Sequence, residues 1–282
     1  MLRRILVPLD SSEFCLAATQ TAIRIAQRES TGKRRPVTLV GLGIVDTDLI
    51  PTGRFSGVVD RDKILAEAGE LRDQLVETFR EKVLAAGMPE DRLDLVRAEG
   101  SPFREMIRES VFSDLIVMGE TCSFPPVNQD YETLKHLYHE ASRPILLTHG
   151  GDKAAETVVM AMDGTAPSSR MMYNYVHLNP FPQARLVLTY SRREEAGYNL
   201  SVYFARVVKY LESFGFSVTE NPIDGEMVDD LANVVKSENA QVVALGIQRE
   251  HFLDRFSDPL GLRQNFAARL LGVMDASLFL VH

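Results

Sequence analysis

Asp114-Leu115-Ile116-Val117-Met118-Gly119 returns later in the chain with the same character, as Gln241-Val242-Val243-Ala244-Leu245-Gly246. Each is a continuous apolar run between a polar residue and a glycine, a pattern typical of parallel strands that are covered on both faces. An opening apolar run that ends at Asp10 likewise returns as a run that ends at Asp163. A repeat distance of roughly 130 to 150 residues is too long for a solenoid unit and suits a duplicated domain.

Strand-like and helix-like segments alternate through both halves. In the first half the pattern predicts strands at 5–9, 37–45, 93–98, 115–118 and 145–148, and helices at 14–26, 63–86, 102–110 and 131–140. In the second half it predicts strands near 157–162, 184–190, 216–223, 241–245 and 277–281, and helices near 166–177, 197–214, 226–238 and 261–273. Right-handed crossovers between such strands predict an α/β fold, two Rossmann-like domains that each hold a five-stranded parallel sheet with helices on both faces. Gly150-Gly151 marks the joint, so the predicted domains are residues 1–150 and 151–282.

Charge and composition exclude several classes of protein. The net charge of −8 divides evenly, −4 in each half, and an acidic surface disfavours broad binding to nucleic acid or anionic membranes. The chain opens without signal-peptide features and has no apolar run of roughly 18 residues, so no membrane span is predicted. Cys15 and Cys122 are expected to be reduced thiols. We therefore expect a soluble cytosolic protein.

These landmarks together resemble the universal stress protein family in its tandem, two-domain form. The residues that carry the resemblance are Asp10 and Asp163 at the ends of the opening strands, the segment from Gly100 to Gly119, and the closing Pro144-Ile145-Leu146-Leu147. The resemblance covers essentially the whole chain and implies the adenine nucleotide alpha hydrolase-like type of Rossmann-like fold. It also implies a cytosolic, stress-induced, dimerising protein, in a family with ATP-binding and non-ATP-binding members.

Asp10 and Asp163 are the first candidates for a binding site. Ligands of open parallel sheets lie beyond the carboxyl ends of the strands, where the strand order reverses. The resemblance implies that an aspartate at this position contacts a nucleoside. The alternative is that each carboxylate satisfies free backbone N–H groups at the start of the following helix. Both interpretations stay open at this point.

The phosphate signature of the family, Gly-x2-Gly-x9-Gly-[Ser/Thr], is degenerate in the first domain. It would begin at Gly119, but its second glycine is Cys122 and its closing Gly-Ser falls on Tyr131-Glu132. Glycines would let backbone N–H groups approach phosphate, and a helix start would face it. Prolines and carboxylates occupy the segment instead: Glu120, Pro125, Pro126, Asp130 and Glu132. Negative charge without glycines disfavours ATP here.

The second domain lacks the signature too, but its loop is rich in arginine. Guanidinium groups bind phosphate without glycines, so Arg249 and Arg263 are candidates beside Gly246. The alternative is a solvated loop in which Arg249 and Arg255 pair with neighbouring carboxylates. The predicted cofactor-binding residues are Asp163, Gly164, Gly246, Arg249 and Arg263, followed by Asp10 and Gly119.

Other constellations support no enzyme chemistry. His136 and His139 share a helix face, but with Cys122 they fall short of a zinc site, so no metal is predicted. Ser11 and His149 lack the Gly-x-Ser-x-Gly elbow of a hydrolase, so no catalytic residue is assigned.

The sequence favours a stress-response protein that acts as a noncatalytic binding or regulatory module, with no firm cofactor. The alternative is a protein that binds ATP or another nucleotide at an atypical site in the second domain and hydrolyses it slowly. The expected partners are the protein itself and a protein of unknown identity. Self-association would use the closing strands, 145–148 and 278–281, because edge pairing covers exposed backbone groups. It would form an internal pseudo-dimer; whether the whole chain also forms a homodimer stays open at this point.

Overall fold

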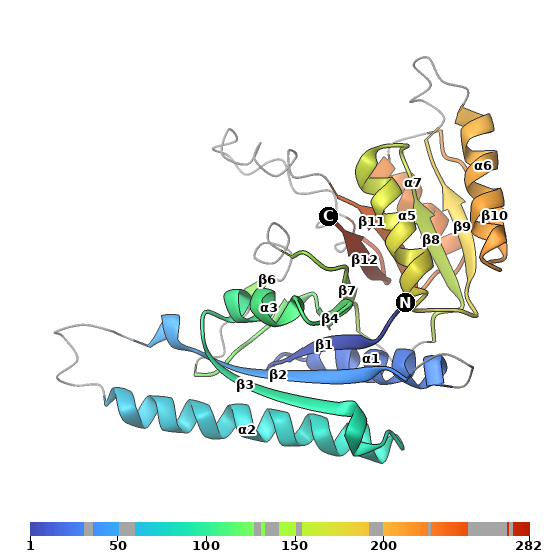
Figure 1. The fold of residues 1–282 in the computed structure, drawn as a ribbon. Helices are drawn as coiled ribbons and strands as arrows, with labels where there is room; N and C mark the ends of the chain where they lie inside the picture. Colours follow the sequence, from blue (N-terminus) through green and yellow to red (C-terminus); the bar gives the residue numbers. More distant parts are fainter. Residues whose placement is uncertain are drawn as a thin grey trace, which may run out of the picture. The chain divides into compact units, whose positions relative to one another are not determined.

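The computed structural model describes residues 1–30, 36–50, 60–126, 131–132, 141–150, 154–191, 200–224, 227–247, 270 and 273–282. The chain divides into two compact units (Figure 1). The first unit is Leu2–Asp152, and the second is Lys153–His282 together with Met1. Within the described residues, no helix is both long enough and apolar enough to cross a membrane.

The first unit is a parallel sheet with helices on both faces. Its strands are β1 (Arg4–Leu9), β2 (Thr38–Asp46), β3 (Leu93–Gly100), β4 (Leu115–Gly119) and β7 (Ile145–Thr148), with a short pair β5 (Thr121–Cys122) and β6 (Tyr131–Glu132). Its helices are α1 (Cys15–Ser30), α2 (Arg61–Ala85) and α3 (Pro102–Ser110), with 3-10 turns at Thr47–Leu49 and Glu90–Arg92. The strands lie in the order β7-β4-β1-β2-β3, all parallel. Figure 1 shows α2 and α3 on opposite faces of this sheet.

Close packing of α2 on the sheet explains two glycines of β2. A Cβ atom at Gly41 would lie 2.6 Å from the ring of Phe79, and one at Gly43 would lie 2.6 Å from Val76. Phe79 and Val76 are buried on α2, which begins after Asp60, whose side chain accepts the N–H of Lys63. Removing the Cβ atoms lets the helix lie directly on the strand, which a larger residue would prevent.

The second unit has the same succession of elements. Its strands are β8 (Thr157–Ala161), β9 (Arg185–Thr189), β10 (Val218–Glu220), β11 (Val242–Gly246) and β12 (Ser277–Val281), and its helices are α5 (Ala166–Leu178), α6 (Leu200–Ser213) and α7 (Met227–Ser237). The strands lie in the order β10-β9-β8-β11-β12, all parallel. In each unit the first strand is central, and the order reverses between it and the fourth long strand. The predicted fold class is therefore confirmed, with the switch point beside β1 and beside β8.

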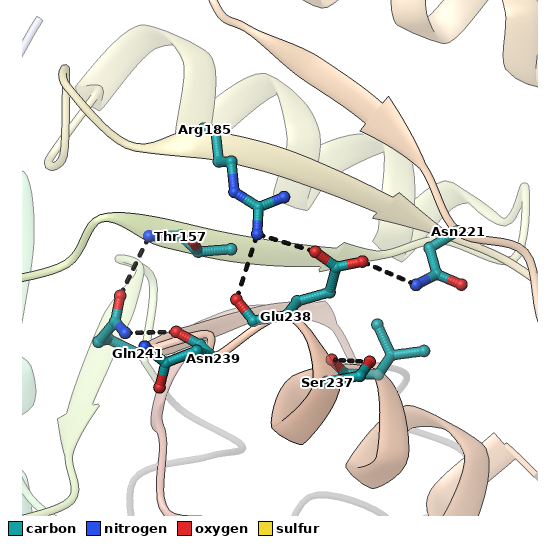
Figure 2. Close-up of polar contacts among 8 residues, drawn as sticks. Thr157, Arg185, Asn221, Ser237, Glu238, Asn239 and Gln241 are labelled. Atoms are coloured by element: carbon teal, nitrogen blue, oxygen red, sulfur yellow. Dashed lines mark hydrogen bonds and ion pairs between the residues drawn. The ribbon is translucent and has the colours of Figure 1, made fainter.

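The amino edges of the two sheets share one hydrogen-bonding arrangement. In the first unit Oδ2 of Asp114 accepts the backbone N–H groups of Arg3 and Arg4 at 2.7 and 3.0 Å. In the second, Oε1 of Gln241 accepts the N–H of Thr157 at 3.1 Å (Figure 2) and that of Glu156 at 2.9 Å. In both units, then, a side-chain oxygen of the residue before the fourth strand accepts the backbone N–H groups at the start of the first strand.

An additional polar cluster in the second unit joins the residue after α7 to the start of β9 and to the residue after β10. Figure 2 shows the carboxylate of Glu238 between Arg185 and Asn221. Nη2 of Arg185 donates to Glu238 Oε2 at 2.8 Å, and Nδ2 of Asn221 donates to Oε1 at 3.0 Å. These hydrogen bonds favour the charged carboxylate, so the pKa of Glu238 is lowered, with the bond from Arg185 as the largest cause.

Two predicted helices differ from the structure or lie largely outside it. The helix predicted at 131–140 is wrong at its start, because Tyr131–Glu132 is a strand that pairs antiparallel with Thr121–Cys122. Residues 133–140 lie outside the described part of the chain. Of the helix predicted at 261–273, Leu270 is described as helical, and 261–269 lie outside. The strand predicted at 216–223 is shorter, Val218–Glu220.

Candidate functional site: the carboxyl edges of the two sheets

Asp10 follows β1 and is almost completely buried. Its side chain is 2% exposed, and its Oδ1 atom accepts the backbone N–H of Ser12 at 2.6 Å and that of Ser123 at 3.2 Å. The two donors come from the turn before α1 and from the chain after β4. Asp10 therefore joins two segments of the first unit that lie far apart in the sequence.

The chain after β4 crosses the carboxyl ends of β1 and β2. We call residues 121–125 the crossing segment. The N–H of Ser11, just after β1, donates to Ser123 O at 2.8 Å, and the N–H of Asp46, the last residue of β2, donates to Pro125 O at 2.6 Å. Phe124, between these contacts, is 0% exposed. Backbone groups of the crossing segment therefore occupy the switch-point edge of the first sheet.

Gly119 and Cys15 have structural roles beside this segment. A Cβ atom at Gly119 would lie 2.4 Å from Cβ of Phe14, so the glycine lets the chain before α1 approach the end of β4. The Cys15 thiol lies against Asp10, whose N–H points at Sγ at 3.5 Å. Burial, and then the Asp10 charge, raise the pKa of Cys15 to about 12. Cys15 and Cys122 are both free thiols.

His149 and Glu120 lie beyond β7 and β4. Nδ1 of His149 is 3.2 Å from Oε2 of Glu120, and both side chains are partly buried. Glu120 was expected to repel phosphate. In the structure this carboxylate faces an imidazole.

Asp163, after β8, is exposed where its counterpart Asp10 is buried. Its Oδ1 atom accepts the N–H of Thr165 at 2.9 Å and the Thr165 hydroxyl at 2.6 Å, at the start of α5. Gly164 has a φ of +77°, and a Cβ atom there would meet no atom within 4 Å. Within the described residues, the surroundings of these two predicted site residues are thus open, and Asp163 also stabilises the turn before the helix.

Gly246 is explained by packing. A Cβ atom there would lie 2.3 Å from the backbone of Pro167 and 2.4 Å from the N atom of Ser168. The end of β11 and the first turn of α5 therefore touch backbone to backbone. The structure brings Gly246 close to the turn that holds Asp163, without assigning the glycine to a ligand.

Sequence reasoning missed one hydroxyl at this edge. Thr189 ends β9 beside β8, in register with Ala161, and is 0% exposed. Among the described residues, its Oγ1 atom has no hydrogen-bond partner. A threonine at the end of an inner strand, next to the central one, is the signal that identifies it, because buried hydroxyls normally have partners.

The arginines predicted for phosphate, Arg249 and Arg263, lie outside the described residues, as do His136 and His139. Across the described ranges, no group of three or more His, Cys, Asp and Glu residues is arranged to hold a metal ion. The arginine prediction therefore stays a prediction.

Solved structures share this architecture. A universal stress protein from Archaeoglobus fulgidus DSM 4304 matches with a TM-score of 0.70 and 14% identity, over 98% of this chain and 97% of that chain. The chain has the universal stress protein fold. A protein of unknown function from Pseudomonas aeruginosa PAO1 matches with a TM-score of 0.55 and 14% identity, over 99% of this chain and 92% of that chain. No protein-family model and no curated protein matches the sequence.

On this universal stress protein fold, the two carboxyl edges are chemically different. The first is covered by the crossing segment, and its aspartate is bound by backbone N–H groups. The second has an exposed aspartate, an open glycine and a buried hydroxyl without a partner among the described residues. The first edge also has a buried hydroxyl without a partner among the described residues, that of Ser123, so what sets the second edge apart is the exposed Asp163 beside the open Gly164.

Proposed function

We propose that this protein is a universal stress protein that acts as a noncatalytic binding or regulatory module, and that its first unit takes no nucleotide. The observation that carries the proposal is the crossing segment over β1 and β2. A nucleoside at the switch point would have to compete with Ser123 for Asp10 and with Pro125 for the N–H of Asp46. It would also have to displace Phe124, which is fully buried.

A ligand at this edge would have to replace contacts that the crossing segment already makes. Opening the crossing segment breaks buried hydrogen bonds, each of net value roughly 0.5–1.5 kcal/mol, and exposes an aromatic side chain worth roughly 1.5–3 kcal/mol of burial. A ligand in the first unit must recover that free energy before it gains any affinity. The predicted phosphate loop offers such a ligand few contacts, since Gly119 is packed against Phe14.

The alternative function is nucleotide binding by the second unit, with slow hydrolysis. Its support is the exposed Asp163 next to the open Gly164, with the buried hydroxyl of Thr189 at the same edge. These groups offer hydrogen bonds to a sugar or base. Arg249 and Arg263, predicted from the sequence, would supply the charge for phosphate. ATP is the nucleotide that the family resemblance suggests.

Calorimetry on the full chain tests both functions. ATP is titrated with and without Mg²⁺ into the wild type, Asp10→Asn and Asp163→Asn, and phosphate release is followed in parallel. The noncatalytic proposal expects no phosphate release, and no binding that Asp10→Asn weakens. Turnover of ATP by the wild type would overturn it. Micromolar binding that Asp163→Asn weakens and Asp10→Asn leaves unchanged would establish the alternative site.

We also propose that the protein works in the cytosol and associates with itself. The support is the sequence and the position of β7 and β12, each the last strand of its own unit's sheet. A strand in that position is stabilised by pairing with a further strand, because the pairing provides hydrogen bonds for its outer backbone N–H and C=O groups. NMR relaxation on the full chain is the test, and two units that tumble independently would contradict an internal pseudo-dimer.

A further inference from the structure

Four aromatic rings form a continuous strip on the surface of the second unit. Tyr173 and His177 come from α5, Tyr210 comes from α6, and Phe214 follows directly after α6. Ring centroids are 4.1 Å apart for Tyr173 and His177, 5.7 Å for His177 and Phe214, and 5.1 Å for Phe214 and Tyr210. We call these four residues the aromatic strip. It links two helices that right-handed crossovers place on the same face of the sheet.

The aromatic strip is exposed although the core beneath it is complete. Tyr173 is 57% exposed and Phe214 is 45% exposed. The neighbouring core aromatics, Tyr175, Phe204 and Phe216, are no more than 6% exposed. The rings of the strip are therefore not part of the buried core, and they contact one another at the surface. Clustered exposed aromatic side chains are the composition typical of protein interaction sites.

The helices that carry the strip are basic, on a unit that is acidic. Residues 151–282 hold 12 Lys and Arg against 16 Asp and Glu, a net charge of −4. Yet α5 has Arg170 and no carboxylate, and α6 has Arg206 and Lys209 against Glu212. All three cations are exposed. Most of the unit's negative charge therefore lies elsewhere.

The two arginines occupy matching places on the two helices. Arg170 precedes Tyr173 by three residues and Arg206 precedes Tyr210 by four, so each lies one helical turn before a ring of the strip. Nε of Arg170 donates to the backbone O of His282 at 3.2 Å, which fixes the direction of its guanidinium group. Each of the two helices thus carries a cation in the turn before its first ring of the strip.

We infer that the aromatic strip is a docking surface for an acidic segment of a partner protein that carries aromatic or long aliphatic side chains. The rings would bury those apolar side chains, and Arg170 and Arg206 would pair with the carboxylates. Charge complementarity selects this occupant. A second copy that offered the same face would bring like charges together, and nucleic acid is disfavoured by the net charge of the unit.

The test uses a fluorescein-labelled peptide of about 12 residues that alternates glutamate with leucine and has one central phenylalanine. Its matched control is the same peptide with lysine in place of glutamate. Fluorescence anisotropy with the full-length protein is expected to show the acidic peptide binding at least about tenfold more tightly than the lysine peptide, and more weakly as salt rises. Equal binding of the two peptides, or no binding of the acidic one, overturns the proposal.

Variants of the protein locate the site. Tyr173→Ala/Phe214→Ala is expected to weaken the acidic peptide at least about tenfold, and Arg206→Glu about fivefold with the rings intact. The matched control is Phe112→Ala in the first unit, which removes an aromatic side chain that is 64% exposed. Circular dichroism is used to check that each variant is folded. An effect of Phe112→Ala as large as that of the strip variant overturns the site. So does a wild-type dimer that the strip variant dissociates, because the occupant would then be a second copy.

Discussion

The carboxyl edges of the two units start from the same strand order and end in different chemistry. At the first, Asp10 is 2% exposed and accepts N–H groups from Ser12 and Ser123. At the second, Asp163 is exposed and accepts both of its hydrogen bonds from Thr165, within its own turn. An aspartate at the end of the central strand can thus hold a tertiary contact in one copy and a local turn in the other.

In the first unit the closure comes from the chain after the fourth strand. In the first unit that chain turns back over β1 and β2, where its backbone groups meet Ser11 and Asp46. In the second unit the residue after β11, Ile247, continues beside β12, with its N–H donating to Val281 O at 2.9 Å. The first path covers the switch point of its sheet. A conserved sheet order therefore does not by itself preserve a ligand site.

The largest expected effect tests Gly246, the glycine that ends the fourth strand of the second unit, against Gly164 in the turn after β8. Gly246→Ala should lower the free energy of unfolding by about 3 kcal/mol, because the added Cβ atom would lie 2.3 Å from the backbone of Pro167. Gly164→Ala, at a φ of +77° in open space, should cost about 1 kcal/mol. Urea unfolding followed by circular dichroism measures both. Equal losses would show that packing is not what requires Gly246.

The next effect compares the two aspartates directly. Asp10→Ala should cost about 2 kcal/mol, because it leaves two N–H groups, one of them buried, without their acceptor. Asp163→Ala should cost about 1 kcal/mol, the usual value for a turn or cap at a helix start. Urea unfolding is again the measurement, with Asp10→Asn as the control that keeps one acceptor oxygen. A larger loss for Asp163→Ala would reverse the comparison.

Thiol labelling reports on the crossing segment. Cys122 is buried within that segment, and Cys15, with a pKa of about 12, is ionised at pH 8 in roughly one molecule in 10,000. A disulfide-exchange reagent should therefore react with neither thiol in the native protein and with both in denaturant.

In a Cys15→Ser background, Asp10→Ala should speed the labelling of Cys122 about tenfold, because the carboxylate holds the neighbouring Ser123. Asp163→Ala in the same background is the control and should leave the rate unchanged. Rapid labelling of the native protein would mean that the first edge opens readily and is no more closed than the second.

The smallest effect concerns the polar cluster around Glu238 in the second unit. The pKa of Glu238 is lowered by Arg185 and Asn221, so its contribution to stability is present above the unfolded pKa of about 4.3 and is lost as pH falls through the folded value. Glu238→Gln should therefore cost about 1 kcal/mol at pH 7, a modest value because the pair is partly exposed, and almost nothing near pH 3.

Unfolding curves from pH 3 to pH 7 measure that dependence. Asn221→Ala removes one of the two hydrogen bonds and should cost less than Glu238→Gln at pH 7. A loss for Glu238→Gln that stays constant over this range would contradict the assignment.

Much of the fold was predictable from apolar patterning. The run 115–118 was predicted as a strand and is part of β4, and the strands predicted at 145–148 and 277–281 have the observed bounds of β7 and β12. Such runs are reliable because a strand buried on both faces must be apolar throughout. The helix predicted at 131–140 is wrong at its start because Tyr131–Glu132 pairs with Thr121–Cys122. That pairing is a tertiary contact, and it outweighs local propensity.

The candidate site was less predictable, for reasons that its residues make clear. Gly119 and Gly246 were predicted to approach phosphate, which stays a prediction; in the structure each also lies against the protein's own chain, at Phe14 and at Pro167. A glycine shows that something comes close to the backbone without showing what. Likewise, nothing in the sequence of residues 121–125 tells that Ser123 reaches Asp10, because that hydrogen bond spans 113 residues.

The sequence alone determined the alternation of strands and helices, the repeat, and the place of Asp10 and Asp163 at the ends of the first strands. These follow from which residues can be buried and from the handedness of the crossovers, which are local properties of the chain. The tertiary structure alone decided that Asp10 is closed beneath the crossing segment while Asp163 is exposed. Closure depends on backbone hydrogen bonds between distant segments, and every residue type except proline can donate them.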